Sequence, residues 1–378
     1  MYKEIPCCIM RGGTSKGLFL LDKDLPPQGE ERNATLLKLM GSPDARQIDG
    51  LGGATSTTSK AAILSPGGRR DIDVLYTFAQ VAIEQPFVSY AGNCGNISSG
   101  VGPFAIECGL VAAQSPVTTV RIWNENTKKL LVEEIQTPNG KVSYEGSFNI
   151  AGVKNPAAPV KMKFLDPAGS MGMGLLPTGK AVDILNVEGF GEIEVSIVDA
   201  TNPLVFIRAC DVGMDGTDSP SAIDSDTQLL DTLEKIRGEA AKRLGLVEDA
   251  AESAVKSPGI PKMTVVSRPR AYTATTGETI PKEEIDIVSR MMSMQKAHPT
   301  YAMTGAMCTA AAAVIPGSIV AQMVSEKFDP AALHIGQPSG VLVAGVEYSN
   351  GTNDDVIIRA AFGFRTARLL MKGTAYLE

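Results

Sequence analysis

Hydrophobic and polar positions alternate with a period of two along much of the first half of the chain, which is typical of half-buried β strands. The alternation is clearest between residues 71 and 83, where Ile72, Val74, Tyr76 and Phe78 share one face. Strand-like segments of this half also occupy residues 5–10, 18–21, 61–64, 117–122, 129–135 and 141–144. This half is therefore predicted to consist mainly of hairpins.

Helical spacing appears at two places in the same half, residues 31–40 and residues 97–113. The first has Leu36, Leu37 and Met40 on one face and ends at ordinary helix-stop signals. The second reads as a buried helix that follows a tight turn. Because it is one buried helix among many strands, we expect a sheet wrapped around it.

The second half of the chain repeats this organisation. Strand patterns there alternate with predicted helices over residues 226–244, 283–295, 307–315 and 365–371. The turn Thr304-Gly305 opens a buried helix, as Cys94-Gly95 does in the first half, although little else of the sequence repeats. Glycines at 169–179 interrupt the pattern. We therefore predict two domains, 1–180 and 181–378, and leave open whether the last segment returns to the first domain.

Composition narrows the classes of function. The chain has 378 residues and a net charge of -7, so it lacks the basic surface of a nucleic-acid-binding protein, and any anion site must be local. No apolar run reaches membrane length. Six scattered cysteines and the lack of a signal-peptide pattern predict a reduced, cytoplasmic protein. With only His298 and His334 available, we expect no metal site.

Two loops rich in glycine and hydroxyl groups carry candidate chemistry. Residues 11–17 combine three glycines, two hydroxyls and two cations, a composition that can hold an anion, but their order is not that of a nucleotide-binding P-loop. Residues 47–60 form the second loop, which Lys60 closes at a strand entrance. On these residues alone, Lys60 is either a functional cation or an ordinary surface lysine.

Cys94 lies in the turn Asn93-Cys94-Gly95-Asn96, directly before the predicted helix 97–113. The first N–H groups of a helix lack intrahelical partners, and the partial positive charge there favours a thiolate and welcomes a carboxylate. Cys94 could therefore give or take a proton. The alternative is that Cys94 is a small residue packed in a glycine-rich turn.

Several segments together resemble the PrpF family, and the likeness runs from about residue 5 to residues 365–368. They are residues 10–17 (MRGGTSKG), 41–44 (GSPD), 46–50 (RQIDG), 58–60 (TSK), 93–96 (NCGN) and 101–105 (VGPFA). The family contains 2-methylaconitate isomerase, 3-methylitaconate delta-isomerase and 4-oxalomesaconate tautomerase. The resemblance implies an α+β, diaminopimelate-epimerase-like fold, with two similar domains, each a barrel-like sheet around a central helix, and a site in the cleft between them.

The resemblance also implies which residues act. Lys60 and Cys94 correspond to the presumed catalytic pair. Candidate ligands for substrate carboxylates are Thr14, Ser15, Asn93, Gly95, Asn96, Thr304 and Gly305. Thr304 replaces the second thiol of the related two-cysteine racemases, which argues against racemisation. Gln337 stands where family members commonly have a histidine, which leaves the role of residues 336–340 and the substrate choice open.

The expected reaction is a 1,3-allylic proton shift in an unsaturated di- or tricarboxylate such as 3-methylitaconate or 2-methylaconitate. It needs neither metal nor cofactor if hydrogen-bond donors stabilise the dienolate. Whether Lys60 or Cys94 is the base is left open. One alternative is 4-oxalomesaconate tautomerisation, and another is a non-catalytic, carboxylate-binding partner of an aconitase-like dehydratase. A small polycarboxylate is the expected ligand, with no nucleic acid or membrane, and a homo-oligomer is left open.

Overall fold

The computed structural model describes residues 2–90, 94–150, 152–293, 295–351 and 355–378. Its contacts divide the chain into two compact units. Unit 1 comprises Met1–Phe164 and Phe364–Glu378, and unit 2 comprises Leu165–Gly363. Residues 165–180 thus belong to unit 2, and the chain returns to unit 1 for its final segment.

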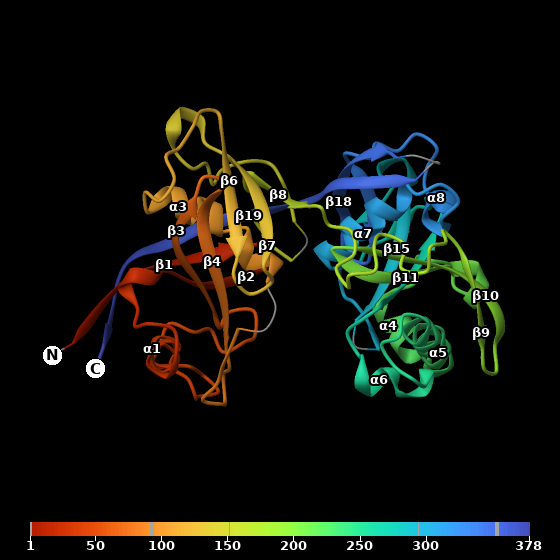
Figure 1. The fold of residues 1–378 in the computed structure, drawn as a ribbon, viewed down its shortest axis with the longest axis horizontal. Coiled ribbons are helices and arrows are strands. Elements are labelled where there is room, and N and C mark those ends of the chain that lie inside the picture. The colour runs from red at the N-terminus through yellow and green to blue at the C-terminus, as the bar shows by residue number, and fades with distance from the viewer. Residues whose placement is uncertain (1, 91–93, 151, 294, 352–354) are drawn as a thin grey trace. The chain divides into compact units, whose positions relative to one another are not determined.

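Unit 1 contains two short 3-10 helices as well as its strands and α helices. The elements are β1 (Lys3–Gly12), β2 (Ser15–Leu21), η1 (Asp22–Asp24), α1 (Glu30–Met40), β3 (Lys60–Arg69), β4 (Ile72–Val81), β5 (Val88–Ser89), α2 (Gly95–Ser98), α3 (Val101–Glu107), β6 (Val117–Asn124), β7 (Lys129–Gln136), η2 (Pro138–Gly140), β8 (Pro159–Leu165) and the later part of β19 (Val356–Leu377). In Figure 1 the end of β19, in blue, lies beside β1, in red, and the two pair antiparallel.

The strands of unit 1 form a sheet with helices on both faces. β1 pairs with β2, β2 runs parallel to β3, and the order continues through β4, β6, β7 and β8. One face of β3, including Ala61 and Ile63, packs with Leu36 and Leu39 of α1. The other face holds α2 and α3, where the ring of Phe104 meets that of Phe19 edge to face. Because successive side chains of a strand point to opposite faces, one face of the sheet packs against α1 and the other against α2 and α3.

Unit 2 has the same plan. Its elements are β9 (Asp183–Val187), β10 (Gly191–Ala200), β11 (Asn202–Arg208), η3 (Ala209–Val212), α4 (Pro220–Ser225), α5 (Thr227–Arg243), η4 (Ala250–Glu252), α6 (Ser253–Lys256), β12 (Lys262–Ser267), β13 (Tyr272–Thr273), β14 (Thr279–Ile280), η5 (Lys282–Glu284), β15 (Ile287–Ser293), β16 (Lys296–Ala297), α7 (Met303–Ala313), α8 (Ile319–Met323), β17 (Leu333–Gln337), β18 (Gly340–Asn350) and the start of β19. Leu233 and Ile236 of α5 pack on one face of its sheet, against residues such as Val205. The buried helix α7 lies on the other, where the Cys308 thiol donates to the Val198 carbonyl at 3.3 Å.

The predicted helix 97–113 is wrong in its extent, because the structure has two short helices, α2 and α3, separated at Ser99 and Gly100. Pro103 gives the physical reason. Its ring would clash with the carbonyl of Ser99 in a continuous helix, but it fits the first turn of a helix that begins at Val101. α3 then ends at Glu107, with Cys108 as its C-cap residue ahead of Gly109, whose φ is +76°.

Three further predictions of secondary structure are wrong. Residues 287–293 form strand β15, in which six consecutive residues are buried; a strand buried on both faces resembles a helix in hydrophobicity. Residues 365–371 are part of β19, whose pairing with β1 overrides the helical pattern. Residues 141–144 form no strand, and β8 pairs with β7 instead. The predicted helices 31–40, 226–244 and 307–315 are confirmed as α1, α5 and α7.

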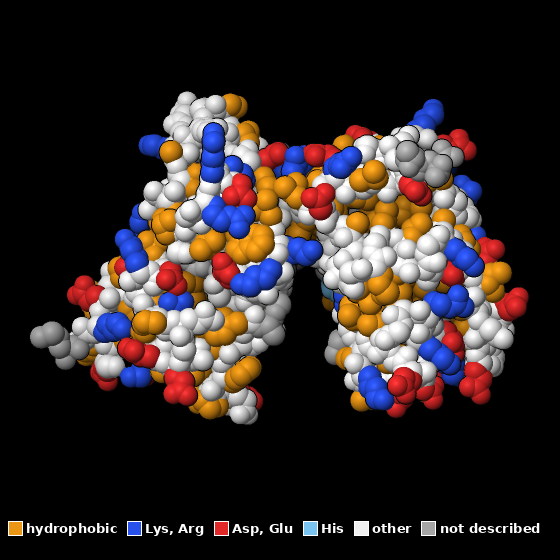
Figure 2. Space-filling model, viewed as in Figure 1, with side chains coloured by type: hydrophobic (Ala, Val, Ile, Leu, Met, Phe, Trp, Pro, Cys, Tyr) orange, Lys and Arg blue, Asp and Glu red, His pale blue; other side chains and the backbone are white. Residues whose placement is uncertain are grey.

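On the face shown in Figure 2, acidic and basic side chains are interspersed over both units and form no extended patch of one sign. This distribution fits the net charge of -7. Among the described residues, no helix is long and apolar enough to cross a membrane.

Candidate functional site

The glycine-rich loop between β1 and β2 packs against the turn that carries Cys94. A Cβ added to Gly12 would lie 2.4 Å from the backbone oxygen of Asn96, and one added to Gly13 would lie 2.1 Å from its side-chain oxygen. Gly13 also has a φ of +52°. Both positions therefore need glycine. Arg11 fixes the loop, because its Nη1 donates to the carbonyls of Gly13 at 2.8 Å and Thr366 at 2.9 Å.

Cys94 is the N-cap residue of α2, and its carbonyl accepts the Ser98 N–H at 2.9 Å. Its thiol is half-buried and lies 4.0 Å from the hydroxyl of Ser15, a buried residue at the start of β2. Because α2 is a single turn, the dipole at Cys94 is smaller than the predicted long helix would supply. The Ser15 hydroxyl is a hydrogen-bond partner of the Cys94 thiol.

Asn96 connects the segments around Cys94. Its side-chain oxygen accepts the backbone N–H of Thr14 and the Nε–H of Arg365, both at 3.3 Å. Two donors on one atom identify that atom as the oxygen of the amide. The structure thus brings Thr14, Ser15, Cys94, Gly95 and Asn96 together in unit 1.

Lys60 is the first residue of β3 and is only 8% exposed. Its ammonium donates to the side-chain oxygen of Gln80 at 2.5 Å and lies 5.2 Å from the centroid of the Phe78 ring. Gln80 is itself held by its bonds to the carbonyls of Ser56 and Ser59. Among the described residues, no carboxylate pairs with Lys60. A buried lysine held by a neutral amide can exchange a proton or meet an anionic ligand.

Gly17 of β2 lies close to both Lys60 and α2. A Cβ on Gly17 would lie 2.5 Å from the Lys60 carbonyl and 3.3 Å from the Ile97 side chain. The absence of a side chain at Gly17 therefore lets the entrance of β3 and the helix after Cys94 approach the same strand.

Two buried ionisable residues of unit 1, Tyr76 and Glu133, were not among the candidates selected from the sequence. Burial raises the pKa of Tyr76, and the nearby Cys94 acts in the same direction. Glu133 is fully buried, and one of its oxygens accepts the Gly102 N–H at 2.8 Å, while burial raises its pKa to about 8. Glu133 stands between Leu131 and Ile135 on the inward face of β7. A carboxylate among apolar alternating positions was the signal that could have revealed it.

Of the remaining predicted residues, two belong to unit 2 and one lies outside the described residues. Thr304 and Gly305 belong to unit 2, in the first turn of α7, where the Thr304 carbonyl accepts the hydroxyl of Thr201 at 2.7 Å. A Cβ on Gly305 would lie 2.1 Å from the Met291 methyl group, so close packing explains this glycine. Asn93 lies outside the described residues.

Gln337 has a structural explanation in unit 2. The side chain is 1% exposed, and its oxygen accepts the N–H and hydroxyl of Ser339, both at 3.1 Å. The Tyr272 hydroxyl donates to the backbone oxygens of Gln337 and Gly340. Gln337 therefore holds the turn between β17 and β18 in shape.

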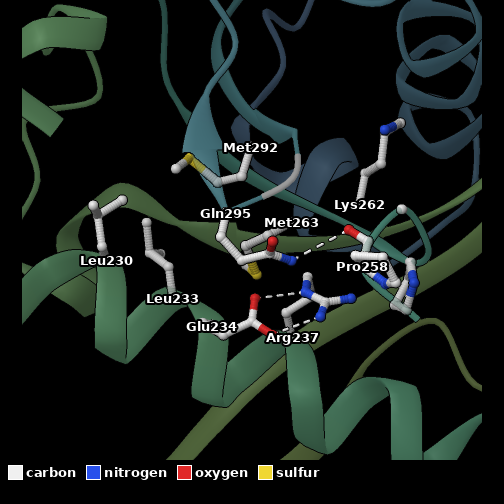
Figure 3. A pocket seen from close by; sticks show the side chains of 11 residues that line it. Leu230, Leu233, Glu234, Arg237, Pro258, Lys262, Met263, Met292 and Gln295 are labelled. Carbon is white, nitrogen blue, oxygen red and sulfur yellow. Dashed lines mark hydrogen bonds and ion pairs between the residues drawn. The ribbon is translucent and has the colours of Figure 1, made fainter. Parts of the chain in front are cut away.

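Two hollows among the described residues contain none of the predicted site residues. Figure 3 shows a pocket of unit 2 beside α5, in which Glu234 and Arg237 pair with each other. Its free volume of about 10 Å³ holds roughly one water molecule. A groove of about 580 Å³ in unit 1 is lined by Ile63 and Ser65, whose side chains alternate with that of Lys60 and face the other side of β3. The described residues contain no cluster of three or more potential metal ligands.

The fold is that of the epimerase-like α+β proteins. A solved hydroxyproline epimerase from Agrobacterium vitis matches 99% of this chain, which covers 93% of that structure, with a TM-score of 0.52 at 11% identity. At that identity the likeness concerns the fold alone, and it agrees with two units that each wrap a sheet around an inner helix.

The chain belongs to the PrpF family, whose model, described as "PrpF protein", matches residues 2–378. It is 46% identical to 3-methylitaconate isomerase of Eubacterium barkeri, over 99% of this chain and 97% of the relative. It is 40% identical to 2-methyl-aconitate isomerase of Shewanella oneidensis, over 98% and 96%. The crystal structure of methylitaconate-delta-isomerase superposes with a TM-score of 0.93 at 45% identity, over 100% of this chain and 96% of that one. The chain is an enzyme of the isomerase class.

Proposed function

We propose that this isomerase moves a carbon–carbon double bond in an unsaturated di- or tricarboxylate by a 1,3-allylic proton shift. Lys60 carries the proposal, because it is a buried cation held by a neutral amide at the entrance of β3, close to the same residue of β2, Gly17, as the helix after Cys94. The names of the relatives favour methylated substrates such as 3-methylitaconate or 2-methylaconitate.

The proposed reaction conserves all atoms. One group removes a proton from the carbon next to the double bond, and the electron pair spreads over a dienolate stabilised by hydrogen-bond donors. A proton then returns to the far end of the allylic system, and the double bond moves by one position. Lys60 and Cys94 are the two groups that exchange these protons.

Each of the two groups can act as the base only in its deprotonated state. As a base, Lys60 must be neutral, and as an acid it must carry its proton. As a base, Cys94 must be a thiolate, for which the Ser15 hydroxyl at 4.0 Å is an available donor. The proposal takes the two as a pair and leaves both directions of proton transfer open.

The test of the substrate class is proton NMR in heavy water with 3-methylitaconate, 2-methylaconitate, cis-aconitate and 4-oxalomesaconate in turn. Deuterium entering an allylic carbon together with a moved double bond supports the proposal and identifies the substrate. Turnover of 4-oxalomesaconate alone would replace the methylated substrates by that acid. Binding of an acid without any exchange would favour a non-catalytic, carboxylate-binding protein.

A further inference from the structure

Arg365 is a buried cation in the part of β19 that belongs to unit 1. Its side chain is among the buried polar groups, and the residue is 9% exposed. Its Nε donates to the side-chain oxygen of Asn96 at 3.3 Å, and its Nη1 donates to the carbonyl of Phe364 at 2.9 Å. Within the described part of the chain, Nη2 has no hydrogen-bond acceptor and no acidic side chain pairs with the guanidinium. Burial lowers the pKa of Arg365 to about 10.

The other buried arginines show how this chain normally compensates such a charge. Arg32 pairs with Asp22 at 2.7 Å, and Arg237 pairs with Glu234. Arg290 lacks an acidic partner but donates to three backbone carbonyls and lies over the Tyr272 ring. Arg365 has neither an acidic partner nor a comparable set of backbone acceptors and an aromatic ring. Because an uncompensated buried charge costs several kcal/mol, its environment is best satisfied by an anion.

The position of Arg365 indicates which anion. The acceptor of its Nε, Asn96, lies two residues after Cys94 and also binds the loop that contains Ser15. A guanidinium presents a planar set of donors that matches a carboxylate in a two-point contact. An anion bound there would lie beside the turn that carries Cys94.

We propose that Arg365 binds one carboxylate of the substrate, while its Nε holds Asn96 beside Cys94. This inference rests on the proposed function and adds the residue that recognises the acid. A purely structural role is the competing explanation, in which Arg365 only fixes Asn96 and the neighbouring loop. The two roles predict different effects of an Arg365 substitution on the binding of a ligand that lacks the carboxylate.

The test compares the binding of 2,3-dimethylsuccinate, a saturated diacid without an allylic proton, with that of its dimethyl ester, which has no carboxylate. Isothermal titration is performed on wild type, R365Q, R365K and the control R368Q. Arg368 is exposed in the same strand, three residues later and therefore on the opposite face. Circular dichroism establishes that each variant is folded before titration.

The proposal predicts that R365Q weakens diacid binding by roughly ten- to a hundredfold, as expected for the loss of a charged hydrogen bond, and weakens ester binding much less. R365K retains part of the affinity because it keeps the positive charge, and R368Q stays within about twofold of wild type. Kinetic assays with the unsaturated substrate should show the same order in KM.

Equal losses for diacid and ester, or equal effects of R365Q and R365K, would overturn the proposal in favour of the structural role. If R365Q is unfolded, N96A supplies the decisive comparison. It removes the acceptor of Nε, and the proposal requires N96A to keep the preference for the diacid over the ester, whereas loss of that preference contradicts it. If the wild type turns over an unsaturated acid and both R365K and R365Q have the KM of the wild type, the role of Arg365 is rejected but the proposed function stands. Wild type that neither binds nor converts any diacid would reject the proposed function itself.

Discussion

Glu133 makes the stability of unit 1 depend on pH in a direction opposite to that of most carboxylates. Burial raises its pKa from 4.5 to about 8 in the folded chain. Between these values the folded state keeps a proton that the unfolded state releases, so the free energy of unfolding falls as the pH rises. Each pH unit inside this window costs about 1.4 kcal/mol. From pH 5 to pH 8 the expected loss is roughly 3 to 4 kcal/mol.

The Glu133→Gln variant removes this titration and keeps an oxygen that can accept the Gly102 N–H. It should match wild type closely at pH 5 and exceed it by roughly 3 kcal/mol at pH 8. Urea denaturation at both pH values measures the difference, followed by the fluorescence of Trp123, the only tryptophan, which lies on β6 of unit 1. All other groups titrate alike in both proteins, so their contributions cancel in the difference between the two free energies of unfolding.

An equal pH dependence in wild type and Glu133→Gln would refute this reasoning. It would mean that the carboxyl group does not hold its proton in the folded state. A variant that is less stable at both pH values by the same amount would show instead that the amide fits the interior poorly.

The other expectations concern the loop of unit 1 and the turn of unit 2. Gly13→Ala should lower the melting temperature by an amount that corresponds to about 1–3 kcal/mol and reduce turnover, because the Cβ meets the Asn96 side chain and φ is +52°. Gly259→Ala, which has no atom within 4 Å of its added Cβ, is the control, and equal effects would contradict the account. Gln337→Ala should speed hydrogen–deuterium exchange in the hairpin of β17 and β18, since two bonds to Ser339 are lost. If the exchange rate of this hairpin is unchanged, Gln337 does not stabilise the turn.

The sequence was informative wherever one local signal decided the structure. Alternation along residues 71–83 predicted β4, and the apolar face of residues 226–244 predicted α5. Length and hydropathy could not separate a doubly buried strand from a helix at β15. The long-range pairing of β19 with β1 is invisible to any local pattern.

The candidate residues of unit 1 could be selected from the sequence to a similar extent, and their roles stay predictions. The glycine loop, Lys60 and Cys94 stand out as unusual segments, and the structure gathers the residues around Cys94 into one cluster. Arg365 was missed because residues 365–371 read as a terminal helix, which gives no reason to place that arginine beside Asn96. Gln80 was missed because a glutamine in a strand carries no signal of its own until its partner, Lys60, is known.

The central claim is that Lys60 and Cys94 together carry the proton shift. The most direct measurement is the rate at which the vinyl proton signals of 3-methylitaconate disappear in heavy water for wild type, K60A, C94A and the control K154A, which replaces an exposed lysine of unit 1. The account predicts that K60A and C94A each fold and lose turnover by roughly 10²- to 10⁴-fold, while K154A matches wild type. A wild-type rate in either K60A or C94A would contradict it.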